Sequence, residues 1–179
     1  MPVIDHFRHS IRTPPSEHLT HEGVLRARRV GERLGEYDFV ATSELPRAIE
    51  TAIAMGYGVD RYYTMLGSLM LADEELDLTV TLGWRHVAEA AKRGQLTAHA
   101  ASCHADLLRS IAASLRGDGG ALLVSHGGVI ELGVVGLLPD LDYAAWGVAC
   151  ERCEGVRLTF EGTTCVEAHL MRLEELLTS

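Results

Sequence analysis

The sequence predicts an α/β fold built on a largely parallel sheet. Three short apolar runs, residues 3–7, 38–42 and 121–125, have the length of buried strands. They alternate with segments whose apolar residues recur at helical spacing, which is typical of parallel sheets covered by helices. The chain has 179 residues, of which 47% are hydrophobic and 23% charged, so we expect one domain over residues 1–179.

The first apolar run ends in a cationic turn. Phe7 is followed by Arg8 and His9, and then by Arg12 and the pair Pro14–Pro15. A strand that ends in this way places its cations at the carboxyl edge of the sheet, where open α/β sheets bind ligands. Guanidinium groups match phosphate oxygens in pairs, so the segment suggests a site for a dianion.

A helix is expected after this turn. Thr20 is a good N-cap, and Gly35 can end the helix. Gly23, in the first turn, allows another backbone to come close. The apolar residues at helical spacing are Val24, Ala27, Val30 and Leu34. They indicate that this helix packs on the sheet.

The second strand, residues 38–42, also leads into a helix. Ser43 is a plausible N-cap, and Pro46 is tolerated in the first turn. Arg47 then stands just inside the helix N-terminus, where it can point at the same sheet edge as Arg8. The alternative is an ordinary exposed helix arginine.

The middle of the chain, residues 56–101, is harder to interpret and is expected to be an insertion that shapes the substrate pocket. Residues 62–66 suggest an extended piece, and residues 71–78 are acidic with apolar residues between. Helices are expected over residues 83–93, with Gly94 as the stop, and over residues 98–116. No histidine pair there has metal-ligand spacing.

The clearest buried strand, residues 121–125, runs into His126, Gly127 and Gly128. Glycines after a strand and before a helix let backbone N–H groups approach an anion. The helix over residues 129–138 is stopped by Pro139. Two strands, residues 155–160 and 164–170, are expected to form a hairpin before a short Leu/Glu-rich tail.

Composition narrows the possible partners. The formal net charge of −9 argues against nucleic acid or an anionic membrane surface as the main partner. No apolar run is long enough to span a bilayer and no signal peptide is visible, so a soluble cytoplasmic protein is expected. Cys150-x-x-Cys153 resembles half of a zinc or redox motif, but free thiols are favoured over a metal site because no second pair matches.

Three strand ends thus place Arg8-His9, Arg47 and His126 at one edge of the sheet. The sequence motifs around these residues resemble those of a known family. The chain resembles the histidine phosphatase superfamily, whose phosphoglycerate-mutase-like fold is a three-layer α/β/α sandwich with a mostly parallel central sheet. The matching motifs are Arg8-His9-Ser10, Leu19-Thr20-His21-Glu22-Gly23, Ser43-Glu44-Leu45-Pro46-Arg47-Ala48-Ile49-Glu50-Thr51-Ala52 and Ser125-His126-Gly127-Gly128.

The resemblance implies a chemistry that needs no metal or cofactor. His9 would attack phosphorus as a neutral imidazole and become a phosphohistidine. Arg8, Arg47 and His126 would bind the phosphoryl oxygens and stabilise developing charge, and Arg12 and Gly127 would join them in binding phosphate.

Two departures from the family pattern affect this expectation. Ser10 stands where the family usually has glycine. Arg12 echoes the acid-phosphatase branch, yet Gly127 stands where that branch has its aspartate proton donor. In the other branch the donor is a glutamate in the middle segment, and here Glu75 is preferred, then Glu74 and Asp73. The alternative is that this acidic run is only a solvated loop.

The sequence therefore predicts a phosphomonoesterase that acts on a phosphorylated small molecule or a phosphoprotein. A mutase is disfavoured because the mutase segment Glu-Arg-His-Tyr-Gly is absent. The rival from another class is a non-catalytic phosphate-binding or regulatory module of the same fold.

Overall fold

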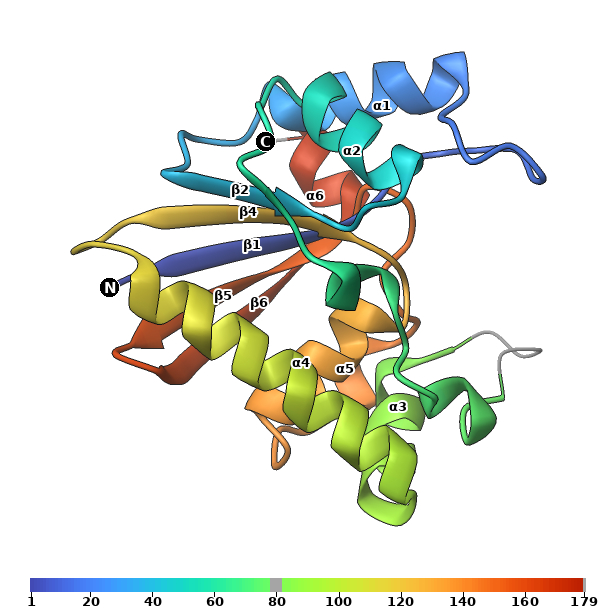
Figure 1. Ribbon diagram of the computed structural model, residues 1–179, viewed down its shortest axis with the longest axis vertical. Helices are drawn as coiled ribbons and strands as arrows, with labels where there is room; N and C mark the ends of the chain where they lie inside the picture. The colour runs from blue at the N-terminus through green and yellow to red at the C-terminus, as the bar shows by residue number, and fades with distance from the viewer. Residues whose placement is uncertain (78–81, 179) are drawn as a thin grey trace.

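A six-stranded sheet forms the centre of the computed structural model, which describes residues 1–77 and 82–178 (Figure 1). The strand order is β3-β2-β4-β1-β5-β6. The strands are β1 (Val3–Arg8), β2 (Phe39–Thr42), β3 (Arg61–Tyr62), β4 (Gly120–Ser125), β5 (Gly155–Glu161) and β6 (Thr164–Met171). The first four neighbours pair in parallel, and β5 and β6 add an antiparallel hairpin. The expected largely parallel sheet is confirmed.

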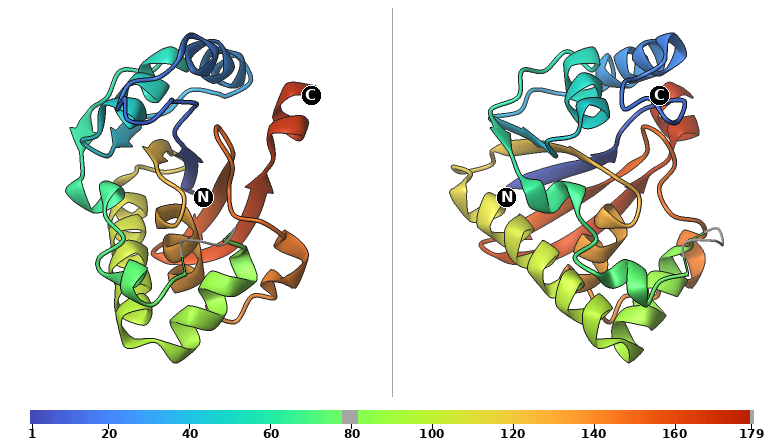
Figure 2. Two further views of the ribbon diagram at one scale, coloured as in Figure 1. Left: turned by 90° about the vertical axis from the view of Figure 1, so that its right-hand side faces the viewer. Right: turned by 45° about the vertical axis from the view of Figure 1, so that its right-hand side comes forward.

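Helices cover both faces of this sheet. One set is α1 (His21–Gly31), α2 (Pro46–Ala54) and α6 (Leu173–Thr178); the other is α3 (Trp84–Arg93), α4 (Gln95–Ser114) and α5 (Val129–Leu137). The two sets lie on opposite sides of the strands, as Figures 1 and 2 show. The described residues also include three 3₁₀ turns: η1 (Thr64–Gly67), η2 (Ala72–Glu74) and η3 (Tyr143–Trp146). The three-layer α/β/α arrangement is thus confirmed.

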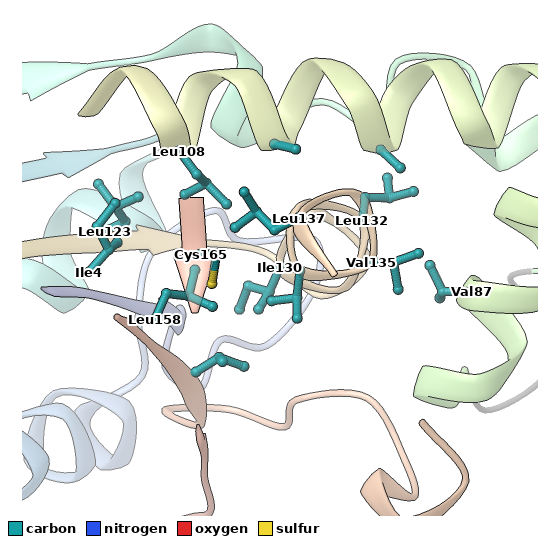
Figure 3. Close-up of a cluster of buried hydrophobic side chains, with 14 of the residues drawn as sticks. Ile4, Val87, Leu108, Leu123, Ile130, Leu132, Val135, Leu137, Leu158 and Cys165 are labelled. Atoms are coloured by element: carbon teal, nitrogen blue, oxygen red, sulfur yellow. The ribbon is translucent and has the colours of Figure 1, made fainter. Parts of the chain in front are cut away.

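Each face of the sheet has its own hydrophobic core. In β4, Leu123 packs in the cluster with α4 and α5, whereas its neighbours Leu122 and Val124 pack in the cluster with α1 and α2. This burial on both faces explains why β4 is an unbroken apolar run. Leu108 of α4 and Ile130 of α5 pack near Leu123 (Figure 3), and each such side chain stabilises the fold by about 1.5–3 kcal/mol.

Helix α1 begins as the sequence predicts and ends earlier. The hydroxyl of Thr20 accepts a hydrogen bond from the Gly23 N–H at 3.0 Å, which confirms Thr20 as the N-cap. The last helical residue is Gly31 and not a residue next to Gly35. A Cβ at Gly31 would meet the backbone of Met55, so glycine at this position lets α1 lie against the end of α2.

Other element boundaries were wrong by a few residues. The N-cap of α2 is Leu45, because the hydroxyl of Ser43 is bonded to His126. Of the expected extended piece, residues 62–66, only Tyr62 lies in a strand, and a 3₁₀ turn follows. Helix α4 starts at Gln95, three residues before the expected start. Residues 78–81, which belong to the expected insertion and include the last residue of the acidic segment, lie outside the described residues. No helix in the described ranges is both long and apolar enough to cross a bilayer.

Candidate active site

The carboxyl ends of three adjacent parallel strands bring the candidate residues together. Strands β2, β4 and β1 are neighbours in the sheet. The N–H of His9 donates to the Ser125 carbonyl at 2.9 Å, and the N–H of Ser43 donates to the Val124 carbonyl at 3.2 Å. These bonds hold the residues just beyond β1 and β2 beside His126, as expected for the edge of a parallel sheet.

His9 is a buried imidazole with one free lone pair. Its side chain is only 3% exposed. Nδ1 lies 2.7 Å from the Ser10 carbonyl oxygen. Because a carbonyl can only accept, Nδ1 carries the proton and Nε2 keeps its lone pair. Burial, and then the charges of Arg152 and His126, lower the pKa of His9 to about 2. The ring is therefore neutral and nucleophilic at neutral pH.

His126 is held between a hydroxyl and a guanidinium. Its Nε2 lies 2.7 Å from Oγ of Ser43, and its Nδ1 accepts from Nε of Arg47 at 3.3 Å. Burial, and then Arg47 and Arg8, lower the pKa of His126 to about 3. The ring centroids of His126 and His9 are 5.1 Å apart. The structure thus brings Arg47, His126 and His9 together and shows His126 orienting Arg47.

Arg8 lies against the glycine loop after β4. A Cβ at Gly127 would stand 2.9 Å from Cζ of Arg8, so a larger residue there would require this guanidinium to shift. Nη1 of Arg8 donates to the Cys150 carbonyl at 2.7 Å. Glu131 accepts from the N–H groups of Gly128 at 2.6 Å and Cys150 at 2.7 Å. This fully buried carboxylate, whose pKa is raised by burial, ties the glycine loop to the segment before β5.

Ser10 replaces glycine without a positive φ angle. Its hydroxyl donates to the Gly23 carbonyl at 2.7 Å, and its N–H donates to Oγ1 of Thr51 at 2.9 Å. A Cβ at Gly23 would meet the Ile11 carbonyl. Ser10 therefore anchors the loop after β1 to α1 and α2, and the left-handed freedom of glycine is not needed here.

Arg12 reaches the site together with a carboxylate that the sequence did not indicate. Nη1 of Arg12 donates to the Ser16 carbonyl at 3.0 Å and lies 3.6 Å from Oε1 of Glu17. The other oxygen of Glu17 forms an ion pair with Nη1 of Arg47. Glu17 follows two prolines in a stretch with no strand or helix pattern, and no spacing in it points to a site residue.

Arg152 is the second site residue that sequence reasoning missed. Its Nη1 lies 2.5 Å from Nε2 and 3.2 Å from Nδ1 of His9. Burial, and then Arg8, Arg12 and Arg47, lower its pKa to about 10. It stands within Cys150-x-x-Cys153, a motif whose recognisable signal is its two cysteines and not the residues between them.

The cysteines around Arg152 are free thiols. Cys150 and Cys153 are both fully buried, and burial raises the pKa of the Cys153 thiol to about 11. Across residues 1–77 and 82–178, no three His, Cys, Asp or Glu side chains cluster as metal ligands would.

Glu75 is bound to the start of α4. Its carboxylate accepts from the N–H groups of Leu96 at 3.0 Å and Thr97 at 2.8 Å, and from the Thr97 hydroxyl at 2.7 Å. These hydrogen bonds, Thr97's first, lower the pKa of Glu75. A carboxylate in this position satisfies the free N–H groups of a helix N-terminus. Asp73 and Glu74, the other two candidates, lie in η2.

The fold is similar to solved structures over nearly its whole length. Phosphoserine phosphatase from Entamoeba histolytica, in complex with 3-phosphoglyceric acid, matches with a TM-score of 0.71 and 20% identity over 99% of this chain and 100% of that one. Phosphoglycerate mutase from Bacillus anthracis str. Sterne matches with a TM-score of 0.64 and 15% identity, over 97% and 94%.

A third solved structure agrees. The mycobacterial glucosyl-3-phosphoglycerate phosphatase matches with a TM-score of 0.59 and 20% identity, over 94% of this chain and 96% of that one. No protein-family model and no curated protein matches the chain. The three neighbours are members of the histidine phosphatase superfamily, and the chain has their phosphoglycerate-mutase-like fold.

Proposed function

We propose that this chain, which has the fold of the histidine phosphatase superfamily, is a phosphomonoesterase that forms a phosphohistidine on Nε2 of His9. The observation that carries the proposal is the buried, neutral His9, whose Nδ1 is fixed by Ser10 while Nε2 faces a guanidinium. Arg152 and Arg47 act on His9, and four arginines lie close enough to the neighbouring His126 for their charges to lower its pKa: Arg47, Arg8, Arg152 and Arg12. A dianionic phosphate is the ligand that such a cluster favours.

In the first step, the lone pair of Nε2 attacks phosphorus. The N–P bond forms as the ester P–O bond breaks, and the leaving oxygen takes a proton from a carboxylic acid. The proton stays on Nδ1 and remains hydrogen-bonded to the Ser10 carbonyl. This hydrogen bond stabilises the positive charge that develops on the ring. Arg8 and Arg47 balance the negative charge on the phosphoryl oxygens, so no step assigned here uses a metal ion.

In the second step, water attacks the phosphohistidine. The P–O bond to water forms as the N–P bond breaks, and the carboxylate that lost its proton accepts one from the water. Inorganic phosphate leaves, and Nε2 regains its lone pair. Two displacements thus replace one direct hydrolysis.

Two carboxylates compete for the proton-donor role. The sequence favours Glu75, but that carboxylate would have to give up its hydrogen bonds to α4. Glu17 already forms an ion pair with Arg47 and lies near Arg12. A phosphate dianion on Arg47 would displace this carboxylate and raise its proton affinity beside the leaving oxygen. We therefore assign the role to Glu17.

The substrate class proposed is a phosphorylated small molecule, with a phosphoprotein as the second option, in the cytoplasm. The names of the structural neighbours point to phosphoserine, phosphoglycerate and glucosyl-3-phosphoglycerate as small phosphorylated compounds. Residues 56–101 are proposed to shape the pocket mouth. Leu69 of this segment supports that role, because its Cδ2 lies 2.7 Å from where a Cβ of Gly128 would stand.

Hydrolysis of an aryl phosphate and an alkyl phosphate tests the proposal. We expect release of inorganic phosphate from both by the wild type and from neither by His9→Ala. Phosphate binding without turnover of either ester would favour the non-catalytic module. Equal turnover by the wild type and His9→Ala would remove His9 as the nucleophile.

A further inference from the structure

We infer that Arg152 is a further catalytic residue, whose guanidinium lies beside the reactive Nε2 of His9 and binds an oxygen of the transferring phosphoryl group. The inference rests on the proposed function. It assigns to the segment before β5 a direct part in the chemistry, alongside the residues at the strand ends.

The Arg152 guanidinium lies over the ring of His9 and not on the lone pair that must react. Its Nη1 is 2.5 Å from Nε2 and 3.2 Å from Nδ1 of His9. A donor on the in-plane lone pair of Nε2 would lie more than about 4 Å from Nδ1, so Nη1 stands above the ring plane. The lone pair of Nε2 stays available for attack, with the guanidinium beside the position that the phosphoryl group takes.

The backbone on both sides of Arg152 is anchored, which holds its side chain at His9. The N–H of Cys153 donates to the Arg8 carbonyl at 3.2 Å, and the N–H of Arg8 donates to the Glu154 carbonyl at 2.8 Å. Arg172 donates to the carbonyls of Trp146 and Val148, each at 2.7 Å. These bonds join the segment that carries Arg152 to the end of β1 and to the residue that follows β6.

The charge around Arg152 favours an anion as its partner. Arg8, Arg12 and Arg47 all act to lower the pKa of Arg152, which is the signature of like charges held close together. A phosphoryl group on Nε2 places oxygens next to this guanidinium. A hydrogen bond from a guanidinium to a phosphoryl oxygen joins two charged groups, so this contact is favourable.

In the proposed step, the N–P bond forms and the ester P–O bond breaks while an N–H of Arg152 donates to an equatorial oxygen. No proton leaves the guanidinium, and the leaving oxygen is protonated by the carboxylic acid. A donor aimed at charge that develops in the transition state typically contributes on the order of 10²–10³-fold in kcat.

Kinetics of Arg152→Ala and Arg152→Lys test the inference, with Glu151→Ala as the matched control on the same segment. Glu151 is exposed. With an aryl phosphate, we expect kcat to fall about 10²-fold in Arg152→Ala. The fall should be smaller in Arg152→Lys, which keeps the positive charge but not the paired N–H donors of a guanidinium. The acid limb of kcat/KM should move to higher pH in Arg152→Ala, because a charge that lowers the pKa of His9 is gone. Glu151→Ala should match the wild type.

Orthovanadate binding provides a readout that does not need turnover. Its trigonal form resembles the transferring phosphoryl group, so we expect affinity to fall at least about tenfold in Arg152→Ala and less in Arg152→Lys. Unchanged vanadate affinity, or an unchanged kcat and pH profile in a folded Arg152→Ala, would overturn the inference. A wild type that hydrolyses neither ester would overturn the proposed function instead, and vanadate affinity would then decide the role of Arg152.

Discussion

The hydroxyl of Ser43 lies 2.7 Å from Nε2 of His126, and this contact fixes which nitrogen of His126 faces Arg47. Because the Arg47 guanidinium only donates, Nδ1 of His126 is the acceptor and Nε2 carries the proton towards Ser43. Arg47 thus sets the tautomer of a histidine at the end of β4, and Ser43 at the end of β2 holds the ring so that Nδ1 faces Arg47.

Ser43→Ala should weaken this arrangement. Loss of a buried hydrogen bond that leaves one partner unsatisfied costs about 1–3 kcal/mol, so we expect a lower Tm. Arg47 also loses its fixed partner, so kcat/KM for an aryl phosphate should fall about tenfold. Ser102, which is on α4, provides the control: Ser102→Ala should change neither quantity. Wild-type kcat/KM in Ser43→Ala would show that Arg47 is oriented independently of Ser43.

Ser10→Gly tests whether the serine that departs from the family pattern has a structural role. The substitution removes the hydroxyl that donates to the Gly23 carbonyl and leaves the backbone N–H bond to Thr51 possible. We expect the free energy of unfolding to fall by about 1–2 kcal/mol in denaturant titrations, with kcat within a few-fold of wild type. A folded variant that lost activity a hundredfold or more would instead place the Ser10 hydroxyl in the chemistry.

Glu17→Gln and Glu75→Gln separate the two candidates for the proton donor. An alkyl phosphate has a poor leaving group and needs the donor, whereas an aryl phosphate hardly does. Glu17→Gln should therefore slow the first, phosphoenzyme-forming step about 10²–10⁴-fold for the alkyl ester and spare that step for the aryl ester, as the alcohol or phenol released in a single turnover measures. Glu75→Gln should spare both, and its weakened contact with α4 should lower Tm. The reverse pattern would return the role to Glu75.

The buried imidazoles predict an acid-sensitive fold. The pKa values of His9 and His126 are lowered to about 2 and about 3 in the folded chain, while an unfolded histidine titrates near a pKa of about 6.5. Between these values the unfolded state binds more protons, so the stability falls as the pH drops below about 6.5.

Denaturant titrations at several pH values measure this effect. The loss should approach the order of 1 kcal/mol per pH unit for each buried imidazole. A His126→Asn variant removes one such group, so its unfolding free energy should depend less steeply on pH than that of the wild type. Equal slopes would mean that His126 is protonated in the folded protein.

The strand ends explain how much of the site could be predicted from sequence. Arg8 ends β1, and His9 and His126 come directly after buried strands; parallel strands bring the residues at their carboxyl ends to one edge of the sheet. Arg47 was predicted from its position at the start of the helix that follows β2. Local pattern is sufficient for such residues, because the sheet itself supplies the long-range geometry.

Residues placed by tertiary contacts were not predictable in this way. Arg152 reaches His9 because Arg172 and the end of β1 hold its segment in position, and neither contact has a local signal. Ser43 has the sequence of a helix cap, but His126 binds its hydroxyl. The acidic run around Glu75 is typical of a solvated loop or of a proton donor, but the carboxylate of Glu75 is bound by the N-terminus of α4.

The position of the phosphoryl group on His9 tests the central claim most directly. Acid-labile, base-stable phosphoenzyme should be trapped from the wild type with a labelled aryl phosphate, and His9→Ala should trap none. Phosphorus NMR of the trapped peptide should assign the group to Nε2, because Nδ1 is bonded to the Ser10 carbonyl. Phosphorylation on Nδ1, on another residue, or equally in His9→Ala would contradict the account.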